Sequence, residues 1–108
     1  FLGHDNPEFK IDINWLNQRA EKLWIHCKNL MALELLNSLD HSYKLNYFFH
    51  DLDFCTLTSM GYIWVYPGKQ PIKNSIAVMP EITNDDISSC KGICSDYILN
   101  YVNKPLNK

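Results

Sequence analysis

Residues 13–39, INWLNQRAEKLWIHCKNLMALELLNSL, are the longest stretch of the chain with a regular apolar pattern. Apolar side chains recur there at alternating spacings of four and three, at Leu16, Ala20, Leu23, Cys27 and Leu30, flanked by Trp24, Met31 and Leu35. Because an α-helix makes one turn in about 3.6 residues, this spacing gathers them on one face. We therefore expect one long amphipathic helix over residues 13–39, with Asp12 or Asn14 as its N-cap.

Beyond this helix the chain becomes aromatic and β-branched, which favours strands. Alternation over residues 43–49 and apolar runs at 54–57, 62–66 and 75–79 indicate the strand positions. Pro67, Gly68 and Pro71 separate the last two runs and are typical of a turn. We expect these two strands to form an antiparallel hairpin within a small antiparallel sheet that the long helix covers.

A second helix is predicted near the end of the chain, from about residue 83 to residue 101. Thr83 or Asn84 can cap it, and Asp85 and Asp86 suit the positive end of its dipole. Its apolar face would hold Ile87, Cys90, Cys94, Tyr97, Ile98 and Tyr101. The expected fold is therefore α+β, with a long N-terminal amphipathic helix packed on a small antiparallel sheet and a short C-terminal helix.

Length and composition indicate one globular domain over residues 1–108, since 46% of the residues are hydrophobic and 20% are charged. Ten basic against twelve acidic residues give a net charge of -2. The basic residues are scattered, which argues against a nucleic-acid partner. No apolar run approaches the roughly 18 residues that span a bilayer, so we expect no membrane segment. The chain begins at Phe1, which is compatible with removal of an upstream signal or anchor.

The cysteines bear on the compartment. Cys27, Cys55, Cys90 and Cys94 are an even number in a short chain, which is compatible with two disulfides in one of three connectivities. This interpretation places the protein outside the cytoplasm, in the periplasm, at the cell surface or secreted. The alternative is four reduced thiols packed as small apolar side chains in a cytosolic protein.

Catalytic and metal-binding patterns are weak. His50, Asp51, Asp53 and Cys55 are ligand types that zinc accepts, but strand alternation sends the last three to the face opposite His50. The C-x3-C spacing of Cys90 and Cys94 is not that of common zinc fingers. No nucleophile, phosphate-binding or dinucleotide motif occurs. We therefore expect no enzyme, and assign no catalytic, cofactor-binding or metal-binding residue.

The aromatic side chains are expected to lie mostly in the core, because small domains fill their volume with them. Trp15, early in the helix, and Trp64, in a run too apolar for one buried face, are the exceptions. These two are the candidate interface residues.

Together with the long helix and the strand at 75–79, the segments 60–66, MGYIWVY, and 82–90, ITNDDISSC, resemble the globular domain of type IV pilins, especially the type IVb branch. The resemblance implies a helix packed on an antiparallel sheet and a disulfide at Cys90. It also implies a non-enzymatic subunit of a fibre or secretion apparatus.

The expected function is therefore a non-enzymatic, extracytoplasmic protein-interaction or assembly module, resembling a minor pilin subunit, whose partner is another protein or a copy of itself. The alternative is a small acidic inhibitor or immunity protein that blocks a toxin or hydrolase by covering its site. A small thiol or metal-dependent enzyme is the third class.

Overall fold

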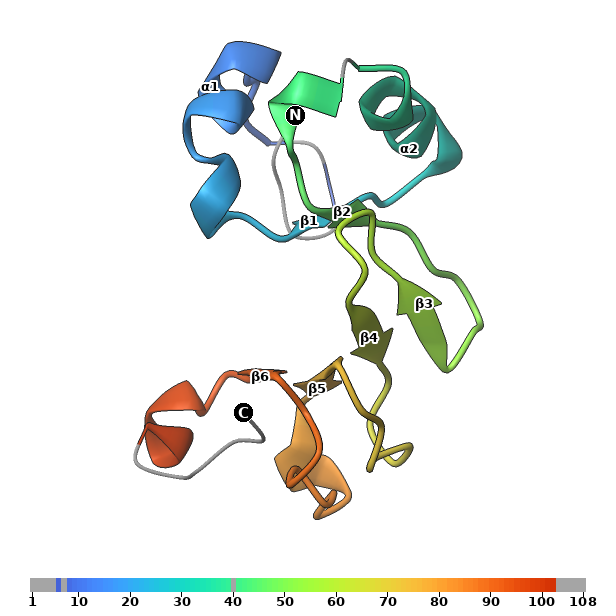
Figure 1. The fold of residues 1–108 in the computed structure, drawn as a ribbon, viewed down its shortest axis with the longest axis vertical. Helices are drawn as coiled ribbons and strands as arrows, with labels where there is room; N and C mark the ends of the chain where they lie inside the picture. Colours follow the sequence, from blue (N-terminus) through green and yellow to red (C-terminus); the bar gives the residue numbers. More distant parts are fainter. Residues whose placement is uncertain (1–5, 7, 40, 103–108) are drawn as a thin grey trace.

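Two groups of elements follow each other along the chain in a computed structural model that describes residues 6, 8–39 and 41–102 (Figure 1). The N-terminal lobe holds α1 (Ile13–Gln18), the 3-10 turn η1 (Ala20–Lys22), β1 (Ile25–His26), α2 (Leu30–Asn37), η2 (His41–Tyr43) and β2 (Tyr47–Phe48). The main sheet and its turns hold β3 (Cys55–Leu57), β4 (Ile63–Val65), β5 (Ser75–Val78), η3 (Pro80–Ile82), β6 (Gly92–Cys94) and η4 (Ile98–Tyr101). Figure 1 shows β3 and β4 between the lobe and the β5–β6 end of the sheet.

The prediction of one helix over residues 13–39 was wrong. Asp12 does cap α1, by accepting a hydrogen bond from the Trp15 amide at 2.8 Å, but the chain is extended at Leu23, with φ −112° and ψ 138°. Asn29 caps α2 through a 2.8 Å bond from the Ala32 amide. Asn side chains compete for backbone groups in this way, which favours helix ends over helix interiors.

The segment between the two helices finds backbone partners elsewhere in the chain. β1 and β2 pair in parallel, with Ile25 opposite Tyr47 and His26 opposite Phe48. The Ile25 amide donates to the Asn46 carbonyl and the Cys27 amide donates to the Phe48 carbonyl, both at 2.8 Å. These bonds replace the ones that a continuous helix would have made, so residues 13–39 are divided among α1, η1, β1 and α2.

The main sheet has the order β3-β4-β5-β6 and is mixed. The strands expected at 54–57, 62–66 and 75–79 are confirmed as β3, β4 and β5, and a shorter β2 lies within 43–49. The antiparallel pair is β3–β4, whose turn is closed by the Gly61 amide donating to the Thr58 carbonyl, with Gly61 at φ +89°. Glycine suits that turn because a side chain is strained at positive φ.

The prediction of an antiparallel hairpin around residues 67–71 was also wrong, because β4 and β5 run parallel, with Ile63 opposite Ser75. Side-chain bonds fix the connection between them. The Asn74 amide group donates to the Gly61 carbonyl at 2.8 Å, and the Gln70 amide group donates to the Ser75 hydroxyl at 2.9 Å. The first bond holds the start of β5 beside the start of β4, and this contact sets the parallel direction.

The predicted C-terminal helix is replaced by turns, β6 and η4. Asp85 accepts from the Gly68 amide at 2.9 Å, and Asp86 accepts from the Ser88 amide at 3.0 Å, so both carboxylates hold loop backbone. Gly92 lies in β6, where an added Cβ would stand 3.0 Å from Cδ1 of Ile76. The absence of a side chain thus lets β6 pair closely with β5.

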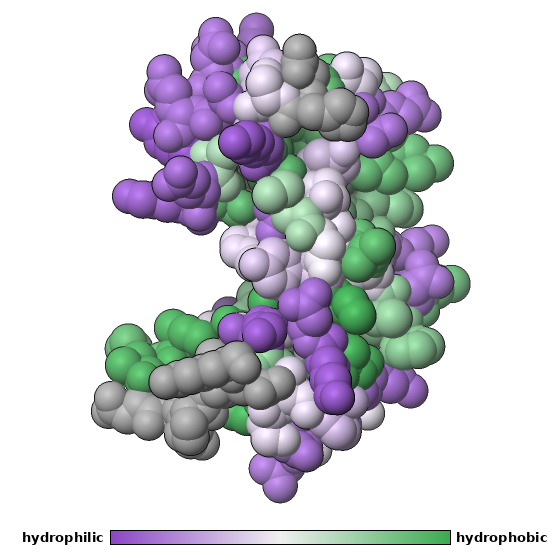
Figure 2. Space-filling model, in the orientation of Figure 1, coloured by the Kyte–Doolittle hydropathy of each residue, from purple (hydrophilic) through white to green (hydrophobic). Residues whose placement is uncertain are grey.

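The predicted fold class is therefore contradicted: short helices accompany two sheets, and the described residues contain no long N-terminal helix. One core cluster joins Leu16, Cys27, Leu36 and Leu45 in the lobe. Figure 2 shows the surface hollowed between the two ends of the molecule, below the hydrophilic side chains of the α1–η1 region. Within residues 6, 8–39 and 41–102, none of the helices is both long and apolar enough to cross a bilayer.

Candidate functional site

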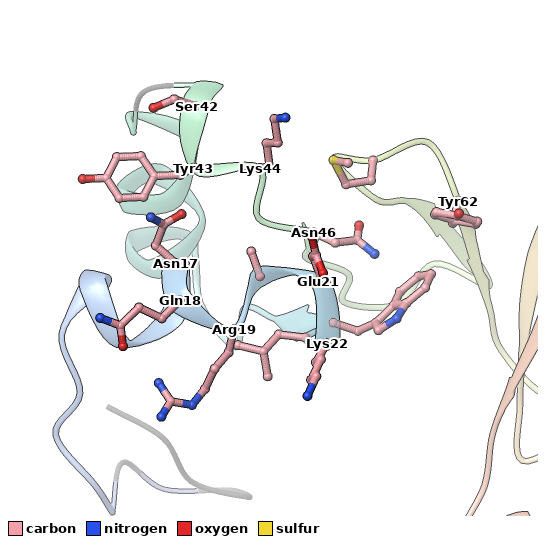
Figure 3. A pocket seen from close by; sticks show the side chains of 14 residues that line it. Asn17, Gln18, Arg19, Glu21, Lys22, Ser42, Tyr43, Lys44, Asn46 and Tyr62 are labelled. Atoms are coloured by element: carbon pink, nitrogen blue, oxygen red, sulfur yellow. The ribbon is translucent and has the colours of Figure 1, made fainter.

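A groove of about 560 Å³ opens between the N-terminal lobe and the turn of the β3–β4 hairpin (Figure 3). Three segments form its walls: η1 with the residues around it, η2 with the residues that lead into β2, and the hairpin turn from Met60 to Tyr62. Its volume lies within the range of about 300–1,000 Å³ that is usual for small-ligand sites. The groove is therefore large enough to take a small ligand.

One side of the groove is aromatic. Trp24 directly precedes β1 and Tyr62 directly precedes β4, so the two strands bring them together from distant parts of the sequence. Their ring centroids lie 5.0 Å apart with planes tilted by 59°. Trp24 nevertheless stays 41% exposed. An indole held by a neighbouring ring but open to solvent is a rigid, flat contact surface for a ligand ring or a partner side chain.

Asn46 contributes a buried polar group to the same groove. Its side chain is only 8% exposed, and its Oδ1 makes no hydrogen bond with any residue that the structure describes. Its backbone carbonyl accepts from the amide of Ile25, the residue that follows Trp24, at 2.8 Å, and both Asn46 and Trp24 line the groove. A buried acceptor without a donor costs about 1–3 kcal/mol. Because Oδ1 itself is buried, a ligand in the groove can reach it only if the side chain rotates.

The rim of the groove is positively charged. Arg19, Lys22 and Lys44 line it, against the single carboxylate of Glu21, although the whole chain has a net charge of -2. The Arg19 guanidinium is already engaged, because it lies 4.2 Å from the Trp15 ring centroid and donates to the Trp15 carbonyl at 3.1 Å. Lys22 and Lys44 supply the remaining positive charge of the lining, and Figure 3 shows their side chains pointing away from each other on different sides of the groove.

Behind the groove the rings continue inward as a ring cluster, which comprises Tyr62, Trp24, Trp64, Phe48, His26 and His50. Centroid separations along it are 6.5 Å from Trp24 to Trp64, 4.5 Å from Trp64 to Phe48 and 4.8 Å from Phe48 to His26. These contacts cross from β4 to β2 and β1. The ring cluster therefore joins the main sheet to the lobe and fixes Trp24 in position.

The inner end of the ring cluster holds two histidines, His26 and His50, with centroids 4.7 Å apart. Burial, and then the nearby charges of Lys28 and His50, lower the pKa of His26 from 6.5 to about 4. A charged imidazole would stand against both the Phe48 ring and a second imidazole, whose own centroids are 6.3 Å apart. His26 is thus held neutral in the folded protein at ordinary pH.

This lowered pKa predicts a loss of stability in acid. The unfolded chain protonates His26 near pH 6.5, whereas the folded chain resists protonation until about pH 4. Stability from this group is complete above pH 6.5 and is lost as the pH falls toward 4. We expect a loss of about 1–2 kcal/mol, allowing for solvent screening of a partly exposed ring.

Urea denaturation at pH 7 and pH 4.5 measures this loss. In His26→Gln, the free energy of unfolding should differ less between pH 7 and pH 4.5, since the variant lacks the titrating group. Equal pH dependence in the wild type and in His26→Gln would contradict the assignment.

The structure places the sequence-predicted residues in different surroundings. Trp15 is partly exposed but is covered on one face by Arg19. Trp64 lies behind Trp24 and against Phe48, half-buried. His50 stacks on His26, while Asp51 and Asp53 are exposed in the following loop. In the part of the chain that the structure describes, no three His, Cys, Asp or Glu side chains are arranged to hold a metal ion.

The four cysteines are free thiols in the structure, so the candidate disulfides are not formed in it. Cys55 in β3 and Cys94 in β6 are separated by the two inner strands, roughly 14 Å at about 4.8 Å for each strand step. A disulfide requires Cα atoms within about 7 Å. Burial raises the pKa of Cys27 and Cys90, and that of Cys94 is raised by burial and then by Asp96 and Glu81.

Thiol labelling tests this arrangement. With maleimide and no reductant, the native protein should react first at the exposed Cys94 and then at Cys55, while the buried Cys27 and Cys90 react only after unfolding. Because the thiolate is the nucleophile and the pKa of Cys94 is raised, its labelling should accelerate between pH 7 and pH 9. Mass spectrometry of peptides gives the order. Cysteines that resist maleimide even in denaturant would instead support the disulfides predicted from the sequence.

A second groove, of about 620 Å³, lies near η3 and η4 and is acidic. Asp85 accepts from Gly68 and Thr83, and Oε1 of Glu81 accepts from Ser95 and Tyr101. The buried Oε2 of Glu81 has no hydrogen-bond partner among the described residues. Its charge is opposite to that of the first groove. An anion should therefore bind less well in this acidic groove than in the first groove.

Sequence reasoning missed Trp24, Tyr62, Asn46 and Lys44 as groove residues. Trp24 was assigned to a helix face, and Asn46 to a strand, because their neighbours in space come from other segments. Lys44 has a left-handed backbone, with φ 51°. Nothing in the local sequence indicated this conformation. None of the family models, curated proteins or solved structures with which the chain was compared matches it.

Proposed function

We propose that this protein is a non-enzymatic binding module and that its ligand or partner enters the groove at Trp24 and Asn46. The observation that carries this proposal is the buried Oδ1 of Asn46, which has no hydrogen-bond donor among the described residues and lies beside a partly exposed indole. A polar group in that position is stabilised when a bound molecule supplies the donor.

The chemistry of the groove supports binding more than catalysis. The described residues that line it offer ring faces, amide groups and ammonium groups, with Glu21 as the one carboxylate and neither a histidine nor a cysteine. Acid–base and nucleophilic catalysis draw mainly on His, Cys and paired carboxylates. Ring faces and amides, in contrast, orient a bound molecule without reacting with it.

The identity of the partner and the compartment remain predictions from the sequence. A protein partner or self-assembly, an extracytoplasmic location and a pilin-like role are compatible with a groove that receives a side chain of another subunit. The alternative, an inhibitor or immunity protein, would present the same exposed aromatic surface to its target. The long helix that the pilin resemblance implied is not among the described elements.

A thermal-shift screen tests the proposal. Wild type and Trp24→Ala are screened against a panel of nucleotides, sugars, amino acids and short peptides. At least one compound should raise the wild-type melting temperature but not that of Trp24→Ala. Trp15→Ala is the matched control, because Trp15 lies outside the groove lining and is also partly exposed. Equal shifts in wild type and Trp24→Ala, or no shift with any compound, would overturn the proposal.

A further inference from the structure

The groove also indicates which class of molecule it takes. Resting on the proposed function, we infer that its ligand is a mononucleotide: a flat ring with amino donors, joined to a phosphate. Three features of the ligand follow from three features of the groove. The ring matches Trp24, the donor matches Asn46, and the anion matches Lys22 and Lys44.

The aromatic side favours a planar ligand. Trp24 is supported by Tyr62 at 5.0 Å and by Trp64 at 6.5 Å, yet it is 41% exposed. Support from behind keeps the indole in one orientation, so little side-chain entropy is lost when a ring stacks on it. Any of the nucleobases can stack on such a ring, because each base has a π-face.

The buried amide favours a ligand with an amino group at the edge of the ring. The Oδ1 of Asn46 is an acceptor and needs an N–H or O–H donor. The exocyclic amine of adenine is such a donor, and asparagine amides pair with the adenine edge. The backbone bond from Ile25 to Asn46 keeps this amide next to Trp24, so one base can stack and donate at once.

The rim favours an anionic group. Arg19, Lys22 and Lys44 are three of the ten basic residues of the chain, and they line the groove from different sides, with Glu21 as the only carboxylate of the lining. A phosphate can therefore meet either Lys22 or Lys44. Their local charge is opposite to the net charge of -2, so the field at the groove attracts anions. A volume of about 560 Å³ suits one nucleotide, and the basic residues elsewhere are too scattered to follow a nucleic-acid strand.

Tryptophan-fluorescence titration at low salt tests the inference with four probes: AMP, adenosine, inorganic phosphate and glucuronate. AMP should bind most tightly, adenosine about tenfold more weakly, and the other two more weakly still. Added salt should weaken the binding of AMP but not that of adenosine, because salt screens the charge of the phosphate. Isothermal calorimetry on the same samples confirms affinities without relying on Trp24.

Variants separate the three contacts. Lys22→Gln with Lys44→Gln should lower AMP affinity about tenfold and leave adenosine unchanged, whereas Lys73→Gln, exposed and outside the groove, should change neither. Asn46→Leu should weaken the binding of both AMP and adenosine, since it removes the acceptor that the base amine would meet. Trp24→Phe should retain binding that Trp24→Ala loses, which excludes a folding defect. Unfolding midpoints are compared for every variant.

The outcomes distinguish this inference from the broader proposal. If glucuronate, or another compound, binds better than AMP and depends on Trp24, the groove is a binding site but the nucleotide assignment is overturned. If adenosine binds as well as AMP, the phosphate contact is overturned. If the four probes and the screening panel all fail to bind, both the inference and the proposed function fail.

Discussion

Phe48→Ala is expected to lower the free energy of unfolding by about 3–5 kcal/mol. Phe48 is 2% exposed and lies at the middle of the ring cluster, 4.5 Å from Trp64 and 4.8 Å from His26 by ring centroids. Removing its ring opens a cavity where the lobe meets the main sheet. Since small domains are stable by about 5–15 kcal/mol, this is a large share of the total.

Urea denaturation followed by circular dichroism measures this change. Leu52→Ala is the matched control, because Leu52 is also a large apolar residue but is 95% exposed, and its loss should change stability by less than about 0.5 kcal/mol. A Phe48→Ala variant as stable as Leu52→Ala would show that the two parts of the molecule do not pack through the ring cluster.

Val65→Asp is expected to prevent folding altogether. Val65 is fully buried in β4, between Cys55 of β3 and Ala77 of β5, and Ala77 is also fully buried. A carboxylate there would have to be buried without a cationic partner, or be protonated, at a cost comparable to the whole stability of the domain. Far-UV circular dichroism and the soluble fraction after expression report the result.

Tyr66→Asp is the control for this substitution. Tyr66 is the next residue along the chain, points to the opposite face of the hairpin and is exposed. The same carboxylate should therefore be tolerated there. A folded Val65→Asp with an unfolding midpoint near that of Tyr66→Asp would contradict the position of β4 at the centre of the sheet.

Part of the fold could be predicted from the sequence because it depends on local patterns. The runs that became β3, β4 and β5 are short, apolar and bounded by turn residues. Asp12, one of the two predicted cap residues, caps the short α1 in place of a long helix. The apolar row in residues 13–39 was only partly right about the core. Leu16 and Cys27 are buried, whereas Leu30, Met31 and Leu35 are exposed. The apolar spacing did not reveal that this segment forms α1, η1, β1 and α2 in place of one helix.

The remaining features depend on contacts between distant segments. The three-and-four spacing of residues 13–39 fits a helix, but the backbone of β1 bonds to β2 instead, and no local pattern records that competition. The parallel direction of β4 and β5 depends on bonds such as the one from Asn74 to Gly61. Trp64 was expected at a surface, whereas Trp24 and Phe48 lie against it.

The groove could not be predicted for the same reason. Its walls come from η1, η2 and the hairpin turn, and none of them carries a motif for a ligand. The scattered distribution of basic residues, which argued against a nucleic-acid partner, does not reveal that Lys22 and Lys44 line the same groove. Folding brings those residues together, so composition alone underestimates the local charge.

The small size of the β1–β2 pair has a consequence for synthesis on the ribosome. Each of these strands has two residues, too few to hold the lobe together by backbone bonds alone. The rings that complete the packing, Tyr62 and Trp64, leave the exit tunnel only after the lobe has been translated. The nascent lobe should therefore stay partly folded, and accessible to chaperones, until the β3–β4 hairpin emerges and the two parts fold together.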